Sequence, residues 1–118
     1  MNSSIHPLQN LHVGKKLTAS FQANDAAVLT WRKDLIARGF VGLETLLAET
    51  AGAFCVGDGF SLADCCVVPQ VLNARRFEVD LSPYPTILRM EKVALAHPGV
   101  IVSHPARQVD TPAEARQA

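Results

Sequence analysis

The sequence predicts a single all-α domain over residues 1–118, and three observations lead to that class. Apolar residues recur at intervals of three and four over residues 24–50, which is the period of a helix with one buried face. Ser61 and Asp64 have the spacing of a capping box at a helix N-terminus. No stretch alternates polar and apolar residues between turn signals, as a half-buried strand would. We therefore expect four main helices and a short fifth.

The first helix is expected to begin close to the start of the chain. Ser3 or Ser4 is available as its N-cap, and with Ser4 in that role Pro7 falls in the first turn, where its missing N–H costs nothing. His6 and Asn10 are four residues apart, so one continuous helix carries both on the same face. The spacing predicts a common polar surface there, with an ordinary solvated helix as the alternative.

The longest helix is expected over residues 24–50. Gly39 and Gly42 lie inside it, and each costs roughly 1 kcal/mol relative to alanine. Close approach by another helix is the expected compensation, because a glycine leaves room for it. We expect Trp31 to pack as an anchor on this helix, which ends at residues 51–52.

The third helix follows a tight loop and runs from Ser61 to about Phe77. The Ser61 side chain can accept from an amide of the first turn while Asp64 reaches back to the N–H of Ser61, which explains Asp64 without a catalytic role. The first half of the helix is apolar nearly all round, so we expect it to be central and covered on most sides. Pro69 in its interior predicts a bend.

The fourth helix is expected to have Pro83 near its first position and to end near His97. The residues expected to face inward on this helix are Ile87, Met90, Val93, Ala94 and Leu95. A short fifth helix carries the apolar residues 100–102, and residues 104–118 form a polar tail.

Composition narrows the partners. The chain has 11 basic and 11 acidic residues and a formal net charge of zero, which gives no electrostatic reason to expect nucleic acid or a membrane surface as a partner. No signal peptide or membrane-length apolar run is visible, so we expect a cytoplasmic protein.

Three cysteines, an odd number, predict neither a disulfide framework nor a metal site. Cys65 and Cys66 fall on the apolar third helix, where we expect buried and unreactive thiols. The residues alone therefore assign no catalytic group.

The stretch Thr50–Ile87 reads TAGAFCVGDGFSLADCCVVPQVLNARRFEVDLSPYPTI, and it resembles the zeta-class glutathione transferases, the maleylacetoacetate isomerases. SSIHPLQNL before it and HPARQVDTP after it also resemble the C-terminal half of that family, so the resemblance covers essentially the whole chain. It implies the helical bundle of a glutathione transferase C-terminal domain without the thioredoxin-like domain. In the family that other domain carries the Ser-Ser-Cys motif. Ser3-Ser4 is followed by isoleucine and histidine, so that role is not transferred.

The family isomerises maleylacetoacetate to fumarylacetoacetate by reversible addition of the glutathione thiolate to the double bond. Such chemistry needs a thiol with a lowered pKa, donors for the developing enolate, and cations that hold the substrate's carboxylates. The resemblance implies that Arg76 binds a substrate carboxylate, since a guanidinium offers bidentate geometry. The alternative for Arg76 is an exposed arginine at a helix C-terminus. The resemblance also implies contacts with glutathione for His6, Asn10, Leu11 and His12.

Two hypotheses follow. In the first, the chain is a glutathione transferase C-terminal domain that is inactive alone and depends on a separate thioredoxin-like domain for its glutathione cofactor, while Arg76 is able to bind a small dicarboxylate. In the second, the chain is a non-enzymatic helical binding or self-assembly module. The expected partner is a second copy of the chain, giving a homo-oligomer that is at least a dimer, or a separate thioredoxin-like domain, because full-length members of the family bury helix surface against that domain and against a second subunit.

Overall fold

The computed structural model describes residues 1–116, which form six α-helices and two short 3₁₀ turns. The helices are α1 (His6–Gln9), α2 (Leu11–Phe21), α3 (Asp25–Thr50), α4 (Leu62–Arg76), α5 (Pro85–Leu95) and α6 (Pro98–Ser103), and the 3₁₀ turns are Pro105–Arg107 and Ala113–Ala115. Within residues 1–116 there is no β-strand, only one isolated bridge between Ala51 and Gly57. The predicted all-α class is confirmed. No helix of this range is long and apolar enough to cross a lipid bilayer.

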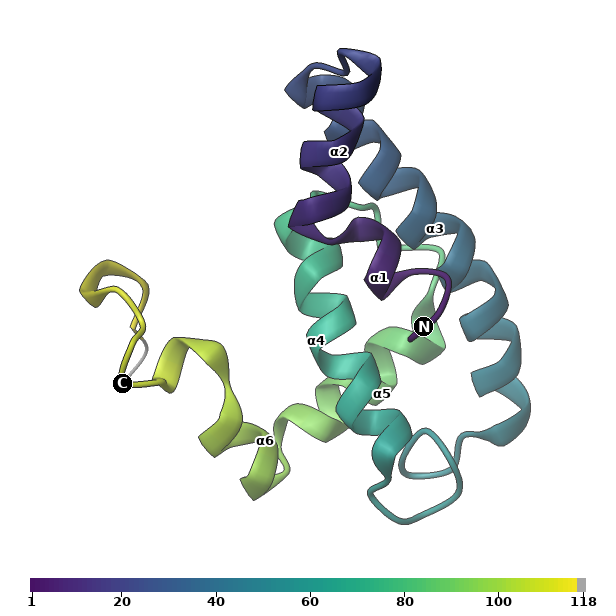
Figure 1. Cartoon of the computed structure of the whole chain (residues 1–118). Coiled ribbons are helices and arrows are strands. Elements are labelled where there is room, and N and C mark those ends of the chain that lie inside the picture. Colours follow the sequence, from purple (N-terminus) through teal and green to yellow (C-terminus); the bar gives the residue numbers. More distant parts are fainter. Residues whose placement is uncertain (117–118) are drawn as a thin grey trace.

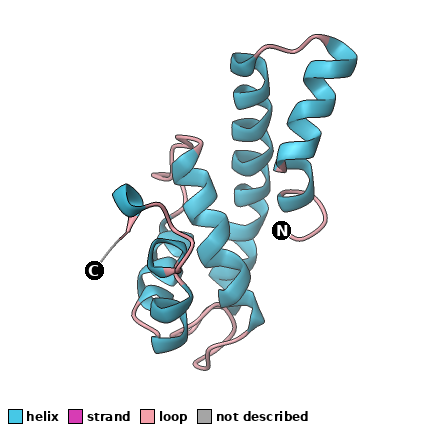
Figure 2. Cartoon of the chain, turned by 60° about the vertical axis from the view of Figure 1, so that its left-hand side comes forward, coloured by secondary structure: helices cyan, strands magenta, loops and turns pink. Residues whose placement is uncertain are grey.

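The helices are arranged around α3. One end of α3 runs beside α1 and α2, and its other part packs against α5, which in turn packs against α4 (Figures 1 and 2). The core lies where α3, α4 and α5 meet; its fully buried members include Ile36, Phe40, Val67, Val71, Ile87 and Met90. From α6 onward the chain leads away from the bundle toward the C-terminus (Figure 1).

The first helix is not continuous, and this corrects the expected count of helices. It breaks at Asn10, whose extended backbone (φ −61°, ψ 155°) ends α1 and precedes α2. The N-cap of α1 is Ile5 rather than Ser3 or Ser4, and it makes no side-chain capping bond. Ile5 is instead a buried core residue.

The long helix α3 begins and ends within one residue of the prediction. The Asn24 side chain accepts a hydrogen bond from the Ala27 amide at 2.9 Å and caps its N-terminus. A side chain at Gly39 would overlap Ile5, so the expected close approach occurs there, but its partner is the residue before α1. Gly42 has nothing close to it, so the expectation of a second close approach was wrong.

Helix α5 begins at Pro85, two residues after the expected start at Pro83. Pro85 suits the first helical position as well as Pro83 does, and a carboxylate from another helix lies at this start. Glu44 of α3 accepts from the backbone N–H groups of Thr86 at 2.7 Å and Ile87 at 2.9 Å, which satisfies two free amides at the N-terminus of α5. Val93 and Leu95 were expected to face inward; Val93 is half-buried and Leu95 is exposed.

Helix α4 starts at a capping box. Asp64 is fully buried, and its Oδ2 accepts from the N–H and the hydroxyl of Ser61, both at 2.9 Å, while Ser61 Oγ accepts from the Ala63 amide at 3.3 Å. Asp64 Oδ1 also accepts from the Cys55 amide at 2.9 Å. One carboxylate therefore caps α4 and ties the preceding loop to it.

The expectation that α4 is covered on most sides was wrong. Val67, Val71 and Ala74 face the core, but Cys65 and Leu72 are exposed. The cysteines are also placed differently from the prediction: Cys65 is exposed and Cys66 half-buried, whereas Cys55 is the buried thiol. Burial, together with the neighbouring Asp64 carboxylate, raises the pKa of Cys55 to about 12.

Asp64 makes stability depend on pH. Burial alone would raise its pKa, but the hydrogen bonds from Cys55 and Ser61 outweigh burial and hold the pKa of Asp64 below the usual value of 3.8. Since the folded-state pKa is the lower one, this stabilisation is complete above the unfolded-state pKa and is lost as pH falls through the folded-state pKa.

We predict that Asp64→Asn lowers the free energy of unfolding at pH 7 by about 2 kcal/mol, because charge-assisted hydrogen bonds are lost. The difference from the wild type should persist at pH 5 and shrink below about pH 4, as measured by urea unfolding. Asp34→Asn, on the exposed side of α3, is the control for removing one negative charge. A difference that stays constant down to pH 3 would contradict this role for the ionised carboxylate.

Candidate functional site

A hollow of about 260 Å³ lies where the junction of α1 and α2 meets the C-terminal end of α4. Its lining comes from four parts of the chain: the α1–α2 junction, α3, the last turn of α4 and the residue that follows it. The lining residues are Gln9, Asn10, Leu11, Arg32, Asn73, Arg76 and Phe77.

The break at Asn10 forms one wall of this hollow. Asn10 ends α1, and its own carbonyl accepts from the amides of Val13 at 3.1 Å and Gly14 at 3.3 Å to start α2. Because the backbone is extended at Asn10, the last carbonyls of α1 have no partner in a following helical turn. Such groups need other donors if they are not to face a large desolvation cost.

Two consecutive side chains of α3 supply those donors. The indole Nε1 of Trp31 donates to the Leu8 carbonyl at 3.3 Å, and Nε of Arg32 donates to the Gln9 carbonyl at 3.2 Å. Trp31 was predicted to be a packing anchor. It does hold α1 to α3, but through a hydrogen bond, and the residue remains 39% exposed. The α1–α2 junction is held at a fixed place along α3.

A buried amide pair holds the same junction to α4. Gln9 and Gln70 are 4% and 3% exposed, and each donates to the other: Gln9 Nε2 to Gln70 Oε1 at 3.2 Å and Gln70 Nε2 to Gln9 Oε1 at 2.9 Å. Each amide satisfies the other at a position where both side chains are almost fully buried. The two elements that wall the hollow are therefore joined directly.

The end of α4 presents Arg76 to the hollow. The helix stops in a Schellman motif, in which Val79 N–H donates to the Ala74 carbonyl and Glu78 N–H to the Arg75 carbonyl, both at 2.9 Å. Glu78 has the left-handed backbone (φ 54°) that this motif requires. Arg76, the last helical residue, is exposed, and its side chain has no hydrogen bond or ion pair with residues 1–116.

The structure brings three of the sequence-predicted residues together. Asn10 and Leu11, at the α1–α2 junction, and Arg76, at the C-terminal end of α4, line the same hollow. His6 and His12 are exposed and do not line it. His6 and Asn10 do not share a helix face, because α1 ends at Gln9.

Sequence reasoning missed Gln9, Arg32, Asn73 and Phe77. Gln9 and Asn73 give no signal, since isolated amides are common on helices. Arg32 carried one: it follows Trp31 on the long helix, and a cation beside a packing anchor is well placed to reach a neighbouring helix end. The ring of Phe77, the C-cap of α4, lies 5.1 Å from the guanidinium carbon of Arg32.

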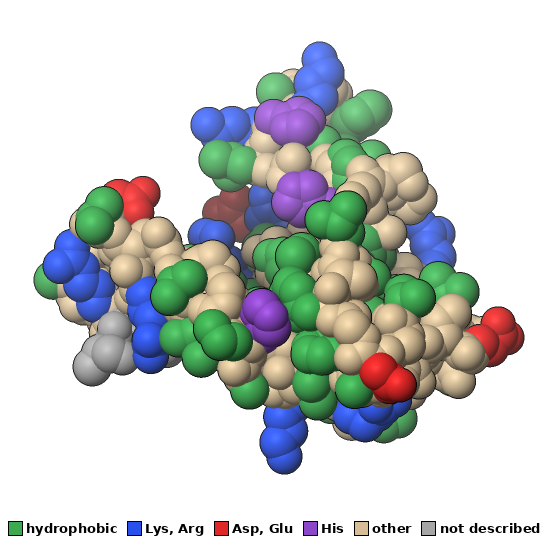
Figure 3. All heavy atoms as spheres, turned by 90° about the horizontal axis from the view of Figure 1, so that it is seen from below, with side chains coloured by type: hydrophobic (Ala, Val, Ile, Leu, Met, Phe, Trp, Pro, Cys, Tyr) green, Lys and Arg blue, Asp and Glu red, His purple; other side chains and the backbone are tan. Residues whose placement is uncertain are grey.

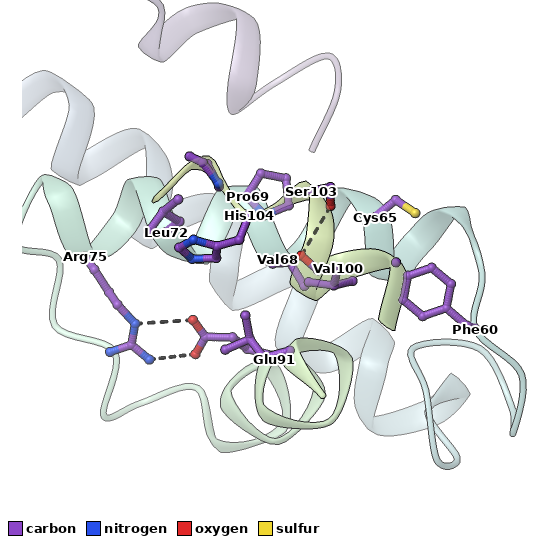
Figure 4. A pocket seen from close by; sticks show the side chains of 13 residues that line it. Phe60, Cys65, Val68, Pro69, Leu72, Arg75, Glu91, Val100, Ser103 and His104 are labelled. Atoms are coloured by element: carbon purple, nitrogen blue, oxygen red, sulfur yellow. Dashed lines mark hydrogen bonds and ion pairs between the residues drawn. The ribbon is translucent and has the colours of Figure 1, made fainter. Parts of the chain in front are cut away.

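A larger groove of about 570 Å³ lies between α4, α5 and α6, and most of its lining is apolar (Figure 4). Val68, Pro69 and Leu72 line it from α4, and Val100 from α6. At one end Arg75 donates to both carboxylate oxygens of Glu91, at 3.3 and 2.6 Å. Seen from below, hydrophobic side chains occupy much of the centre of the molecular surface (Figure 3).

The smaller hollow contains no side chain that could act as a nucleophile or a base, whereas the larger groove contains some. The smaller one has amides, two guanidiniums and apolar side chains but no cysteine, histidine or carboxylate. Cys65, which is exposed, and His104 both line the larger groove; His104 Nδ1 accepts from the Ala106 amide at 3.2 Å, and Glu91 is engaged by Arg75. No group of three or more histidine, cysteine or acidic residues able to hold a metal ion occurs in the described part of the chain.

Known proteins similar to this chain are enzymes of twice its length. The chain is 52% identical over 114 residues to maleylacetoacetate isomerase of Rattus norvegicus, covering 97% of this chain and 50% of the rat protein. It is 46% identical over 116 residues to a probable maleylacetoacetate isomerase of Drosophila melanogaster. No family model matches the sequence. The chain thus spans about half the length of the curated relatives it matches.

Solved structures give the same result. A bacterial maleylpyruvate isomerase, described as a zeta-class glutathione transferase, matches with a TM-score of 0.89 and 38% identity, covering 94% of this chain and 53% of the other. Maleylacetoacetate isomerase of Anaeromyxobacter dehalogenans, with dicarboxyethyl glutathione and citrate in its active site, matches with a TM-score of 0.88 and 41% identity, covering 94% and 50%.

The buried amide pair makes a direct prediction. Gln70→Leu removes both partners of the Gln9 side chain, so we expect the free energy of unfolding to fall by about 1–3 kcal/mol. The double variant Gln9→Leu/Gln70→Leu should recover much of that loss, because no amide is then left unsatisfied. Urea unfolding of Gln9→Leu, Gln70→Leu and the double variant measures the coupling. Additive losses would contradict the pairing.

Proposed function

We propose that this chain, which has the sequence and the fold of the C-terminal helical domain of the zeta-class glutathione transferases, forms the substrate-facing half of a glutathione-dependent isomerase. One observation carries the proposal: the hollow at the α1–α2 junction gathers Asn10, Leu11 and Arg76, three of the residues to which the family resemblance gives binding roles.

The chemistry of the hollow supports binding rather than activation. The Arg76 guanidinium is free of protein partners within residues 1–116 and can donate two parallel hydrogen bonds to a carboxylate. The Asn10 side chain, which makes no capping bond, leaves amide donors and an acceptor for a peptide-like ligand such as glutathione. We infer that the helical half holds the substrate carboxylate and one side of glutathione.

The thiolate has to be generated elsewhere. The hollow supplies two guanidinium charges but no cysteine, histidine or carboxylate that could serve as nucleophile or base, and the family resemblance gives the thiol-activating Ser-Ser-Cys motif to the other domain. We propose that a thioredoxin-like domain, in the same or another polypeptide, provides this function. The 118 residues by themselves are then inactive.

A second candidate function, a self-assembling helical module, is favoured by the apolar groove between α4, α5 and α6. A mostly apolar surface of this size is a candidate for burial in a complex. A second copy of the chain is the occupant under this hypothesis, and sedimentation showing only a compact monomer at high concentration would rule it out.

We predict that the purified chain does not isomerise maleylacetoacetate in the presence of glutathione, and that joining it to the thioredoxin-like half of a relative produces activity. In the joined protein Arg76→Ala should lower kcat/KM by about tenfold or more, because a charge-assisted contact to a carboxylate is lost. Arg38→Ala, an exposed arginine of α3, is the control. Turnover by the chain alone, or an unaffected Arg76→Ala protein, would contradict the proposal.

A further inference from the structure

Two guanidiniums line the same hollow. Arg32 lines it from the N-terminal half of α3, and Arg76 lines it from the last turn of α4. The other lining residues are amides and apolar side chains, and none of them is acidic. A concave site with two positive charges and no negative one attracts anions, and a dianion most strongly.

Arg32 has no acidic partner in the described part of the chain. Its Nε is used by the Gln9 carbonyl, and its guanidinium lies over the Phe77 ring, so neither interaction neutralises its charge. The nearby acids are otherwise placed: Asp25 lines a neighbouring hollow with Arg32 but forms no ion pair with it, and Glu78 pairs with Lys33 at 3.4 Å. Arg32 is only half-exposed, so its charge is incompletely solvated.

The position of the Arg32 guanidinium is fixed before any ligand arrives. Besides the bond to Gln9 and the contact with Phe77, it lies against the backbone of α2 at Gly14, where a Cβ would come within 2.7 Å of Nη2. Arg32 Nη1 and Nη2 have no hydrogen-bond partner among residues 1–116. A held cation with unused donors loses little side-chain entropy on binding an anion.

We infer that Arg32 is a second anion-binding residue of this site, and that Arg32 and Arg76 together bind the two carboxylates of one dicarboxylate. The inference rests on the proposed function, in which Arg76 binds the first carboxylate, and it adds a residue that sets the preference for dianions over monoanions. Arg76 alone can hold only one carboxylate, so it would bind a monocarboxylate as tightly as it binds one carboxylate group of a dicarboxylate. The second guanidinium creates the discrimination.

The test compares dicarboxylates with a monocarboxylate. Dissociation constants of malonate, the longer adipate and acetate are measured by NMR titration of the 118-residue chain at constant ionic strength. The wild type should bind at least one dicarboxylate about tenfold more tightly than acetate. Arg32→Gln should abolish that preference while leaving acetate affinity within about twofold, which a merely structural effect on the site would not do.

Three further variants complete the test. Arg76→Gln should weaken both kinds of ligand, Arg32→Lys should keep part of the preference because the charge remains, and Arg38→Gln, the matched loss of one α3 charge, should change nothing. If Arg32→Gln fails to fold, Arg32→Lys and Gly14→Ala replace it in the test. Gly14→Ala displaces the guanidinium without removing its charge, and both variants should show a reduced preference for the dicarboxylate.

The outcomes separate the two claims. If Arg76→Gln binds both kinds of ligand more weakly but Arg32→Gln keeps the preference for the dicarboxylate, the inference is wrong and the proposed function still stands. The same conclusion follows if Arg32→Gln does not fold and both Arg32→Lys and Gly14→Ala keep the full preference. A wild type that binds dicarboxylates no more tightly than acetate overturns the inference. Binding that is unaffected by substitution of either arginine also overturns it, and in addition removes the support for Arg76 as the substrate-binding residue.

Discussion

The interruption of the helix at Asn10 is the constraint on which the rest of the site depends. It leaves the carbonyls of Leu8 and Gln9 in need of donors, and consecutive side chains of α3, Trp31 and Arg32, supply them. In an unbroken helix these carbonyls would accept hydrogen bonds from the following turn, and Asn10 would be an ordinary helical residue. The break therefore fixes the α1–α2 junction against α3 and opens the hollow beside the end of α4.

The same physical logic recurs at the other helix ends. Asp64 caps α4 and holds the loop before it, and Glu44 of α3 caps α5. Each carboxylate binds amides at a helix N-terminus, where the free N–H groups and the helix dipole both favour negative charge.

Local chemistry explains which parts of the fold could be predicted from the sequence. The bounds of α3 and the start of α4 follow from apolar spacing and from caps that lie within four residues. The start of α5 is ambiguous in the sequence, because Pro83 and Pro85 both suit a first helical position and the carboxylate at the observed start, Glu44, lies on another helix. The break at Asn10 carries no glycine or proline of its own, and Arg32 enters the site through tertiary contacts. Family resemblance pointed to Arg76, Asn10 and Leu11, but not to the shape that joins them.

A crystal structure of the chain grown with malonate tests the central claim most directly. We expect malonate in the hollow at the α1–α2 junction, with its carboxylates within hydrogen-bond distance of the Arg76 and Arg32 guanidiniums and with the Trp31 and Arg32 bonds to α1 retained. Malonate bound in the groove between α4, α5 and α6 instead, or a helix that runs unbroken through Asn10, would contradict it.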